Sequence, residues 1–181
     1  MYISQQLKNQ SISEYLLYMW QVEDIIRAYN LDADRISAEY IPLFKLDAEK
    51  AKELAGWYES QIEMMREEDV TEKGHLQINN NIIILLNDLH SQLLKSSKHP
   101  FYSAAYYKAL PFIVELRAKK GESQEKGEIE NCFDALYGVM LLRMQKKEIS
   151  TETAAAIEHI AKFIAMLSEY YKKDKTGELE L

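Results

Sequence analysis

The chain has 181 residues, and its 22 Lys and Arg against 29 Asp and Glu give a formal charge of −7 at pH 7. Apolar residues make up 47% of the chain and charged residues 28%, a composition that is typical of folded globular proteins and excludes a disordered chain. The single cysteine excludes a disulfide framework and a zinc site built from several cysteines. The acidic balance argues against binding to nucleic acid, which relies on clustered Lys and Arg.

The sequence gives no sign of a membrane segment. Its longest wholly aliphatic run is Ile82–Leu86, whereas a membrane-spanning helix needs about 20 mostly apolar residues. Residues 1–11 are mostly polar and lack the apolar stretch of a signal peptide. We therefore expect a cytoplasmic protein that does not bind membranes, with Cys132 as a free, buried thiol.

The spacing of the apolar residues predicts an all-α fold, a single-domain bundle of about six mostly antiparallel helices. The domain is expected to cover residues 1–173, with a charged loop at Gly121–Gly127 and a flexible acidic tail at 174–181. The six main helices are predicted at about Ser11–Tyr29, 48–68, Thr71–Ser97, Phe101–Lys119, Glu128–Lys147 and Ser150–Lys173.

Capping residues and prolines set the expected helix limits. Asp47 and Ser150 are predicted N-caps, because their side-chain oxygens accept from backbone N–H groups in a first helical turn. A short turn or helix at Asp34–Tyr40 is expected to stop at Pro42. Pro111 lies inside a predicted helix, which it should kink or split.

The helix predicted at Thr71–Ser97 is apolar on two sides, which predicts that it is buried between neighbouring helices. Asn79–Asn81 precede its most apolar run, so at least one of these amides is expected to face a neighbouring helix and to need a hydrogen-bond partner. The two apolar seams are Ile78, Ile82, Leu85 and Leu89, and Leu76, Ile83, Leu86 and Leu93.

The first predicted helix combines Leu16, Trp20, Glu23 and Arg27 on one stripe. Glu23 and Arg27 have the i,i+4 spacing of a helical ion pair. An indole beside a carboxylate and a guanidinium suits a pocket for a polar ligand. A boundary ion pair with Trp20 covering the core is the simpler interpretation, and the sequence favours it.

Arg143 lies on an apolar seam of its helix, where a charge is costly unless it is paired. Its possible partners are Glu23, Glu115 or a carboxylate of another subunit. Together with Asn80 and His90, these residues suggest a polar network inside the bundle. The candidate ligand-binding residues are therefore Trp20, Glu23, Arg27, Asn80, His90 and Arg143.

No metal or cofactor site follows from the sequence. A single zinc ion held by His90, His159 and a carboxylate is an alternative, but a hydrogen-bonded, partly buried His90 is the preferred interpretation. The chain has no P-loop, no Gly-x-Gly-x-x-Gly fingerprint and no Gly-x-Ser-x-Gly elbow, so no catalytic residue is predicted.

The chain has 12 tyrosines, and several of them fall on predicted helices. Tyr102, Tyr106 and Tyr107, beside Phe101, form the densest aromatic group. Tyrosine suits interfaces because it offers apolar area with a polar tip. A contact surface and a set of core aromatics with hydroxyls at the rim explain this group equally well.

Several segments resemble a family of small uncharacterised proteins from Bacteroidetes, classed as a domain of unknown function. The resemblance spans nearly the whole chain and implies an all-helical cytoplasmic protein. It assigns no activity, so it transfers no catalytic residue. The segments that carry the resemblance are Glu14–Arg27, Gly74–Gln77, Glu115–Arg117, Glu128–Gly138 and Leu142–Ser150.

The sequence therefore favours a non-enzymatic interaction or assembly protein, expected to form a homo-oligomer and possessing aromatic-rich helix faces for a protein partner. The alternative is a helical bundle that binds a small polar ligand or a metal ion in its interior, with or without catalysis. The two hypotheses differ on whether the candidate residues line a cavity or satisfy one another.

Overall fold

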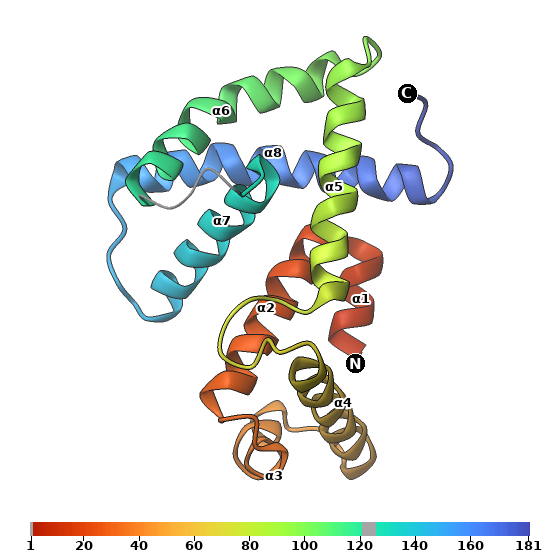
Figure 1. Ribbon diagram of the computed structural model, residues 1–181, viewed down its shortest axis with the longest axis vertical. Helices are drawn as coiled ribbons and strands as arrows, with labels where there is room; N and C mark the ends of the chain where they lie inside the picture. The colour runs from red at the N-terminus through yellow and green to blue at the C-terminus, as the bar shows by residue number, and fades with distance from the viewer. Residues whose placement is uncertain (1, 121–125) are drawn as a thin grey trace. The chain divides into compact units, whose positions relative to one another are not determined.

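The computed structural model describes residues 2–120 and 126–181, and every regular element within them is helical (Figure 1). This confirms the all-α class. The described residues form eight α-helices rather than about six, with a π-helical turn (η1) and a 3-10 turn (η2) after the third. The bounds are α1 Tyr2–Gln10, α2 Ile12–Ala28, α3 Ala33–Arg35, η1 Ile36–Tyr40, η2 Ile41–Phe44, α4 Ala48–Glu67, α5 Gln77–Lys95, α6 Pro100–Lys120, α7 Glu128–Met144 and α8 Thr151–Lys175.

Backbone contacts divide the chain into two compact units. Unit 1 contains Met1–Gln10 and Glu14–Asn81, and unit 2 contains Ser11–Ser13 and Ile82–Leu181. This division does not test whether the chain forms a single domain, which therefore stays a prediction. Among the helices described, none is long and apolar enough to cross a membrane.

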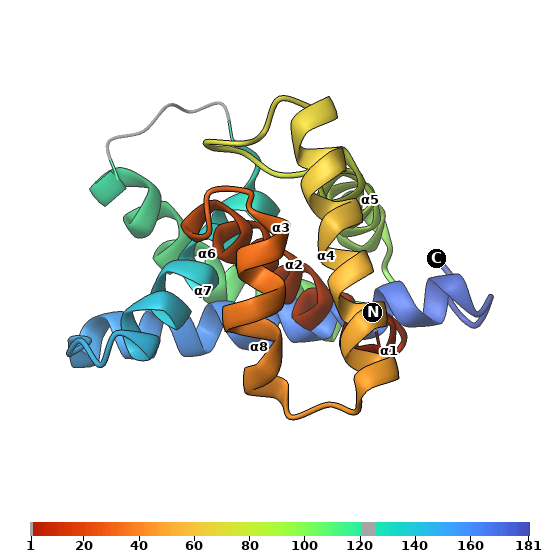
Figure 2. The same cartoon turned by 90° about the horizontal axis from the view of Figure 1, so that it is seen from below.

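Side chains of α2, α4 and the short turns η1 and η2 share one core in unit 1, and α4 packs against α3, η1 and η2 (Figure 2). Aliphatic side chains from these four elements meet the ring of Tyr58, which is almost wholly buried. The core of unit 1 consists of Val22, Ile26, Ile36, Ile41, Tyr58, Ile62, Met65 and Leu76.

Unit 2 is built around α6, α7 and α8. α6 and α8 pack against each other in roughly opposite directions, and α7 packs on both (Figure 1). The fully buried side chains contributed by these three helices include Tyr102 and Ala109, Ile129, Cys132 and Phe133, and Ile160, Phe163 and Leu167.

Several helix limits differ from the expected ones. α1 was not predicted, because Tyr2–Gln10 is mostly polar. α5 begins at Gln77, not near Thr71, because the preceding segment is a loop that contains Gly74 at φ +85°. α7 ends at Met144, before the predicted limit, since Lys146 adopts a left-handed conformation at φ +55°.

The two prolines affect the helices differently. The helical turn before Pro42 ends at Tyr40, as predicted, and Pro42 lies in the first turn of η2, where its missing N–H has no helical partner to lose. Pro111 does not split α6, which continues through it. The predicted N-caps are confirmed: Asp47 accepts from Lys50 N, and Ser150 accepts from Thr153 N.

The structure describes only part of the predicted charged loop, and it extends α8 into the predicted acidic tail. Most of the charged loop predicted at Gly121–Gly127 lies outside the described residues. The backbone carbonyl of Glu180, in the predicted acidic tail, accepts a 2.8 Å hydrogen bond from His99 Nε2. α8 extends to Lys175, and Gly177, two residues later, has a left-handed conformation at φ +72°.

The prediction for α5 was right for one seam and wrong for part of the other. Leu76, Ile83, Leu86 and Leu93 are all buried. Of the other seam, Ile82 and Leu89 are buried, but Ile78 and Leu85 are 47% and 43% exposed.

Candidate functional site

Glu23 is the most unusual polar residue of unit 1, because it has no exposed surface. One carboxylate oxygen, Oε2, lies 2.6 Å from His75 Nδ1. The other, Oε1, accepts from Leu76 N at 3.1 Å and from Asn79 Nδ2 at 2.7 Å. Since a carboxylate only accepts, the proton of the His75 contact lies on Nδ1.

The carboxylate of Glu23 lies at the start of α5. The carbonyl of Leu76 accepts the first hydrogen bonds of this helix, from Asn79 N and Asn80 N, while its own N–H donates to Glu23. Glu68 Oε2 accepts from the next backbone N–H, that of Gln77, at 2.6 Å. Two carboxylates therefore satisfy free N–H groups at the positive end of the α5 dipole.

Trp20 belongs to the same cluster through its ring. Its indole stacks on the imidazole of His75, with centroids 4.1 Å apart and planes within 9°. Trp20 is 2% exposed, so it shields the contact between His75 and Glu23 from solvent on one side. His75 retains 23% exposure of its side chain.

Arg27 and Asn80 both donate hydrogen bonds to backbone carbonyls of the same loop. Arg27 Nη2 donates to the carbonyls of Val70 and Gly74, and Arg27 Nη1 pairs with Asp24 at 2.9 Å. Asn80 Nδ2 donates to the carbonyl of His75 at 3.0 Å. The i,i+4 spacing therefore does not produce an ion pair of Glu23 with Arg27, because each group has closer partners.

Four of the six candidate residues converge on one segment, the loop Val70–Leu76 between α4 and α5. We call this group the loop clamp: Trp20, Glu23, Arg27 and Asn80, together with His75 and Asn79. Their hydrogen bonds go mainly to the protein's own backbone and to one another. The clamp therefore holds the loop in place and caps the start of α5.

His75 and Asn79 were not among the six candidate ligand-binding residues predicted from the sequence. A buried carboxylate in α2 needs donors, but the spacing of residues along the chain does not show which distant residues supply them. The one available signal was the row of three asparagines, of which at least one was predicted to face a neighbour. Asn79 is that residue, and its side chain is wholly buried.

His90, the fifth candidate, lies in an aromatic cluster of unit 2. Its ring packs against Tyr102, Tyr106 and Phe163, and its Nδ1 lies 2.6 Å from the Tyr102 hydroxyl. Burial raises the pKa of Tyr102 and lowers the pKa of His90, although the charge of Glu128 opposes the shift of His90. Both groups are therefore neutral at pH 7, as the preferred interpretation of a hydrogen-bonded histidine requires.

Arg143, the sixth candidate, contradicts the prediction that it lies on a buried seam. It is exposed near the end of α7, so it needs no buried carboxylate. The charge sits in the last turn of its helix, where it interacts favourably with the helix dipole. It lines an open hollow with small residues of α8, among them Ala154, Ala155 and Ala161.

The side chains proposed for the alternative zinc site are engaged elsewhere. His159 stacks on Phe112 with the planes within 8°, and His90 bonds to Tyr102. In residues 2–120 and 126–181, no three His, Cys, Asp or Glu side chains are grouped so as to hold a metal ion. Cys132 is fully buried, and burial raises the pKa of its thiol, as expected for a structural cysteine.

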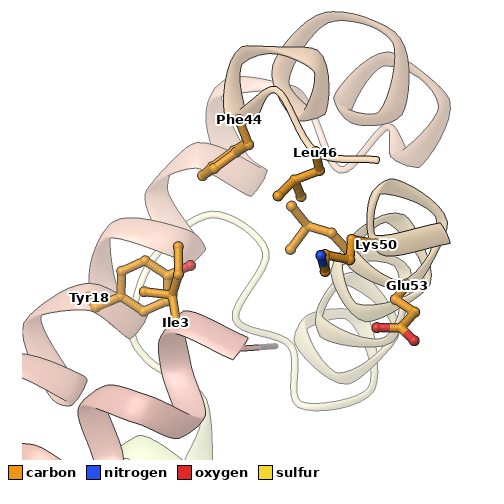
Figure 3. A pocket seen from close by; sticks show the side chains of 7 residues that line it. Ile3, Tyr18, Phe44, Leu46, Lys50 and Glu53 are labelled. Carbon is orange, nitrogen blue, oxygen red and sulfur yellow. The ribbon is translucent and has the colours of Figure 1, made fainter. Parts of the chain in front are cut away.

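Unit 1 also contains a small apolar pocket, shown in Figure 3. Its volume is about 70 Å³, roughly half that of a cavity that holds benzene. Ile3 and Tyr18 face Phe44 and Leu46 across the opening (Figure 3). A pocket of this size admits a few aliphatic carbons. It is lined by Ile3, Tyr18, Phe44, Leu46, Lys50, Glu53 and Leu54.

The aromatic group at the start of α6 divides between core and surface. Tyr102 and Tyr106 are buried, and the Tyr106 hydroxyl donates to Glu128 Oε2 at 2.6 Å. Phe101 and Tyr107 are 79% and 63% exposed. The core interpretation is therefore confirmed for Tyr102 and Tyr106, and the contact surface stays a prediction for the exposed Phe101 and Tyr107.

The exposed side of α6 is apolar along most of its length. Phe101 and Ala104 are exposed near its start, and Val114, about three turns after Ala104, is 54% exposed. Pro111 is exposed between Ala104 and Val114. Because its buried side is apolar too, α6 has almost no polar face, which is unusual for a helix at a surface. We call this side the α6 face: Phe101, Ala104, Tyr107, Lys108, Pro111 and Val114.

These features define, over the described residues, a helical protein whose buried polar side chains bind its own backbone and whose helix α6 exposes Phe101, Tyr107 and Val114. The chain belongs to the family described as "Domain of unknown function (DUF4924)", whose sequence profile matches residues 1–178. This confirms the resemblance to a domain of unknown function. No curated protein and no solved structure matches the chain.

Proposed function

We propose that this chain is a non-enzymatic cytoplasmic protein that acts through protein–protein contacts, and that the α6 face is its contact surface. The observation that carries the proposal is the exposure of Phe101, Tyr107 and Val114, at 79%, 63% and 54%, on one side of one helix. Contiguous exposed apolar surface of this kind marks interaction sites. Aromatic residues are enriched in the cores of such interfaces.

The loop clamp supports the same proposal indirectly. Its carboxylate accepts three hydrogen bonds from the protein itself, and Arg27 bonds to two backbone carbonyls. Groups satisfied in this way have little capacity left for a substrate. The candidate residues then serve the fold, while the contact surface serves the partner.

A second candidate function is the binding of a small polar molecule inside unit 1. Asn79 Oδ1 favours it, because this wholly buried acceptor has no hydrogen-bond partner among the described residues. A molecule with one donor group would satisfy it. Native mass spectrometry of wild-type protein and of N79A tests this candidate: an added mass present only in the wild type supports it, and equal bare masses contradict it.

Site-specific photo-crosslinking in living cells tests the contact surface. A photoreactive phenylalanine analogue replaces Tyr107, and in a matched control it replaces Ala165, an exposed residue of α8 flanked by Lys162 and Glu169. We expect a discrete crosslinked protein band from position 107 and none from position 165. The absence of a band from position 107, or equal bands from both positions, would contradict the proposed function.

A further inference from the structure

The α6 face has a spacing that is its own mirror image about the point between Tyr107 and Lys108. Its other exposed residues lie three and six positions before Tyr107 and three and six positions after Lys108, so Ala104 matches Pro111 and Phe101 matches Val114. The six positions cover about 20 Å of helix. An antiparallel helix with the same face meets this one residue for residue.

We propose that the partner of the α6 face is a second copy of this chain, related by a two-fold axis that passes between Tyr107 and Lys108. This inference rests on the proposed function and names its partner. In the pair, Phe101 of each copy packs on Val114 of the other. The small Ala104 lies opposite Pro111, so two α6 helices approach to the ordinary distance of about 8–10 Å.

The charge of the face disfavours a basic partner and is compatible with a second copy. Lys108 is the single charged residue between Phe101 and Val114, so the face offers no carboxylate for a basic partner to bind. The two-fold axis places each Lys108 beside Tyr107 of the other copy. A lysine over a tyrosine ring is attractive, and this contact separates the two ammonium groups. The α6 face of one copy can therefore pack against the α6 face of another.

The size of the face sets the strength of the pair. One helix face is smaller than the roughly 800 Å² that each partner buries in a standard interface. We therefore expect a dimer that dissociates readily, with a dissociation constant in the micromolar range or above. Sedimentation velocity over a range of protein concentrations should show the change from monomer to dimer, and F101D, which places a carboxylate against Val114, should remain monomeric.

Two single-cysteine additions test the geometry of the pair in the full-length protein. In K108C the two new cysteines lie next to the two-fold axis. The distance between their Cα atoms is then within the range of about 4.4–6.8 Å that a disulfide needs. In A118C, an exposed control on the same helix, they lie about 30 Å apart in the antiparallel pair. The wild type controls for Cys132, which is buried.

The expected result is a disulfide-linked dimer under mild oxidation for K108C and none for A118C or the wild type. Dimers from both variants would mean a parallel pair, and a dimer from A118C alone would mean a different register; each overturns the proposed arrangement. A protein that stays monomeric at every concentration, with no K108C dimer, overturns the second copy as partner. If position 107 then still crosslinks to another protein in cells, the proposed function survives this failure.

Discussion

At the scale of single residues, Glu23 is a buried carboxylate that stabilises the fold through its hydrogen bonds. A carboxylate removed from water is unfavourable unless donors surround it. Glu23 meets three, and two of them belong to the backbone and side chain at the start of α5. The same contacts fix the end of the preceding loop, so the residue joins α2 to a segment more than 50 positions away in the chain.

Removal of this carboxylate should destabilise unit 1. We expect E23A to lower the free energy of unfolding by about 2 kcal/mol or more, since it leaves Leu76 N and Asn79 Nδ2 buried without an acceptor. The matched control is E63A, an exposed Glu→Ala change in α4, which should cost less than about 0.5 kcal/mol. Urea unfolding measures both, and equal losses in the two variants would contradict a role for the clamp.

His90 should make stability depend on pH. Burial lowers its pKa below the ordinary value of 6.5, so the unfolded chain binds a proton before the folded chain does. Its contribution is therefore complete above pH 6.5 and is lost as the pH falls below that value. H90N retains an acceptor for Tyr102 but does not titrate. The stability advantage of wild type over H90N should shrink between pH 7.5 and pH 5, and an advantage that grows on acidification would contradict this assignment.

The residue types of the site could be predicted, but their partners could not. Trp20, Glu23 and Arg27 share a helical stripe, so their proximity followed from the 3.6-residue period. Their partners, His75 and the carbonyls of Val70 and Gly74, come from an irregular loop that no period describes. Arg143 was misplaced because the seam that carries it extends past the buried part of α7.

At the scale of elements, the helix starts that carry a capping side chain were predicted well, whereas the start of α5 was predicted near Thr71 and lies at Gln77. Asp47 and Ser150 cap α4 and α8 as predicted, because a capping side chain is visible in the sequence. Some ends depend on non-glycine residues in the left-handed conformation, such as Asp69 after α4 and Lys146 after α7, both at φ +55°. Glycine is the usual signal for that conformation, and its absence hid the end of α7, which was predicted at Lys147, whereas the end of α4 was predicted to within one residue.

Pro111 offers a test at this scale. It removes one backbone N–H from the interior of α6, although the helix continues through it. We expect P111A to raise the free energy of unfolding by about 1–3 kcal/mol, because alanine restores that hydrogen bond and has the higher helix propensity. V114A, an exposed change on the same helix, is the control. The measurement is urea unfolding at low protein concentration, and an unchanged or lower value for P111A would refute the expectation.

At the scale of the whole molecule, the net charge of −7 acts against self-association. Two copies repel each other, while the α6 face that joins them is apolar and carries one lysine. Salt therefore weakens the repulsion more than it weakens the attraction. An interface held by opposite charges would respond to salt in the other direction.

Salt should accordingly strengthen the proposed dimer. We expect its dissociation constant to fall several-fold between about 0.01 M and 0.1 M salt, over which the screening length drops from about 30 Å to about 10 Å. Sedimentation velocity at matched protein concentrations measures this change. Weaker association at the higher salt concentration would show that ion pairs, and not the apolar α6 face, hold the two copies together.

The two compact units carry different natural probes. Both tryptophans, Trp20 and Trp57, belong to unit 1, and the single thiol, that of Cys132, belongs to unit 2. Indole fluorescence therefore follows the opening of one unit, while the rate at which a thiol reagent labels the buried Cys132 follows the opening of the other. One unmodified sample thus reports two separate unfolding events, and comparison of the two time courses measures how tightly the units are coupled.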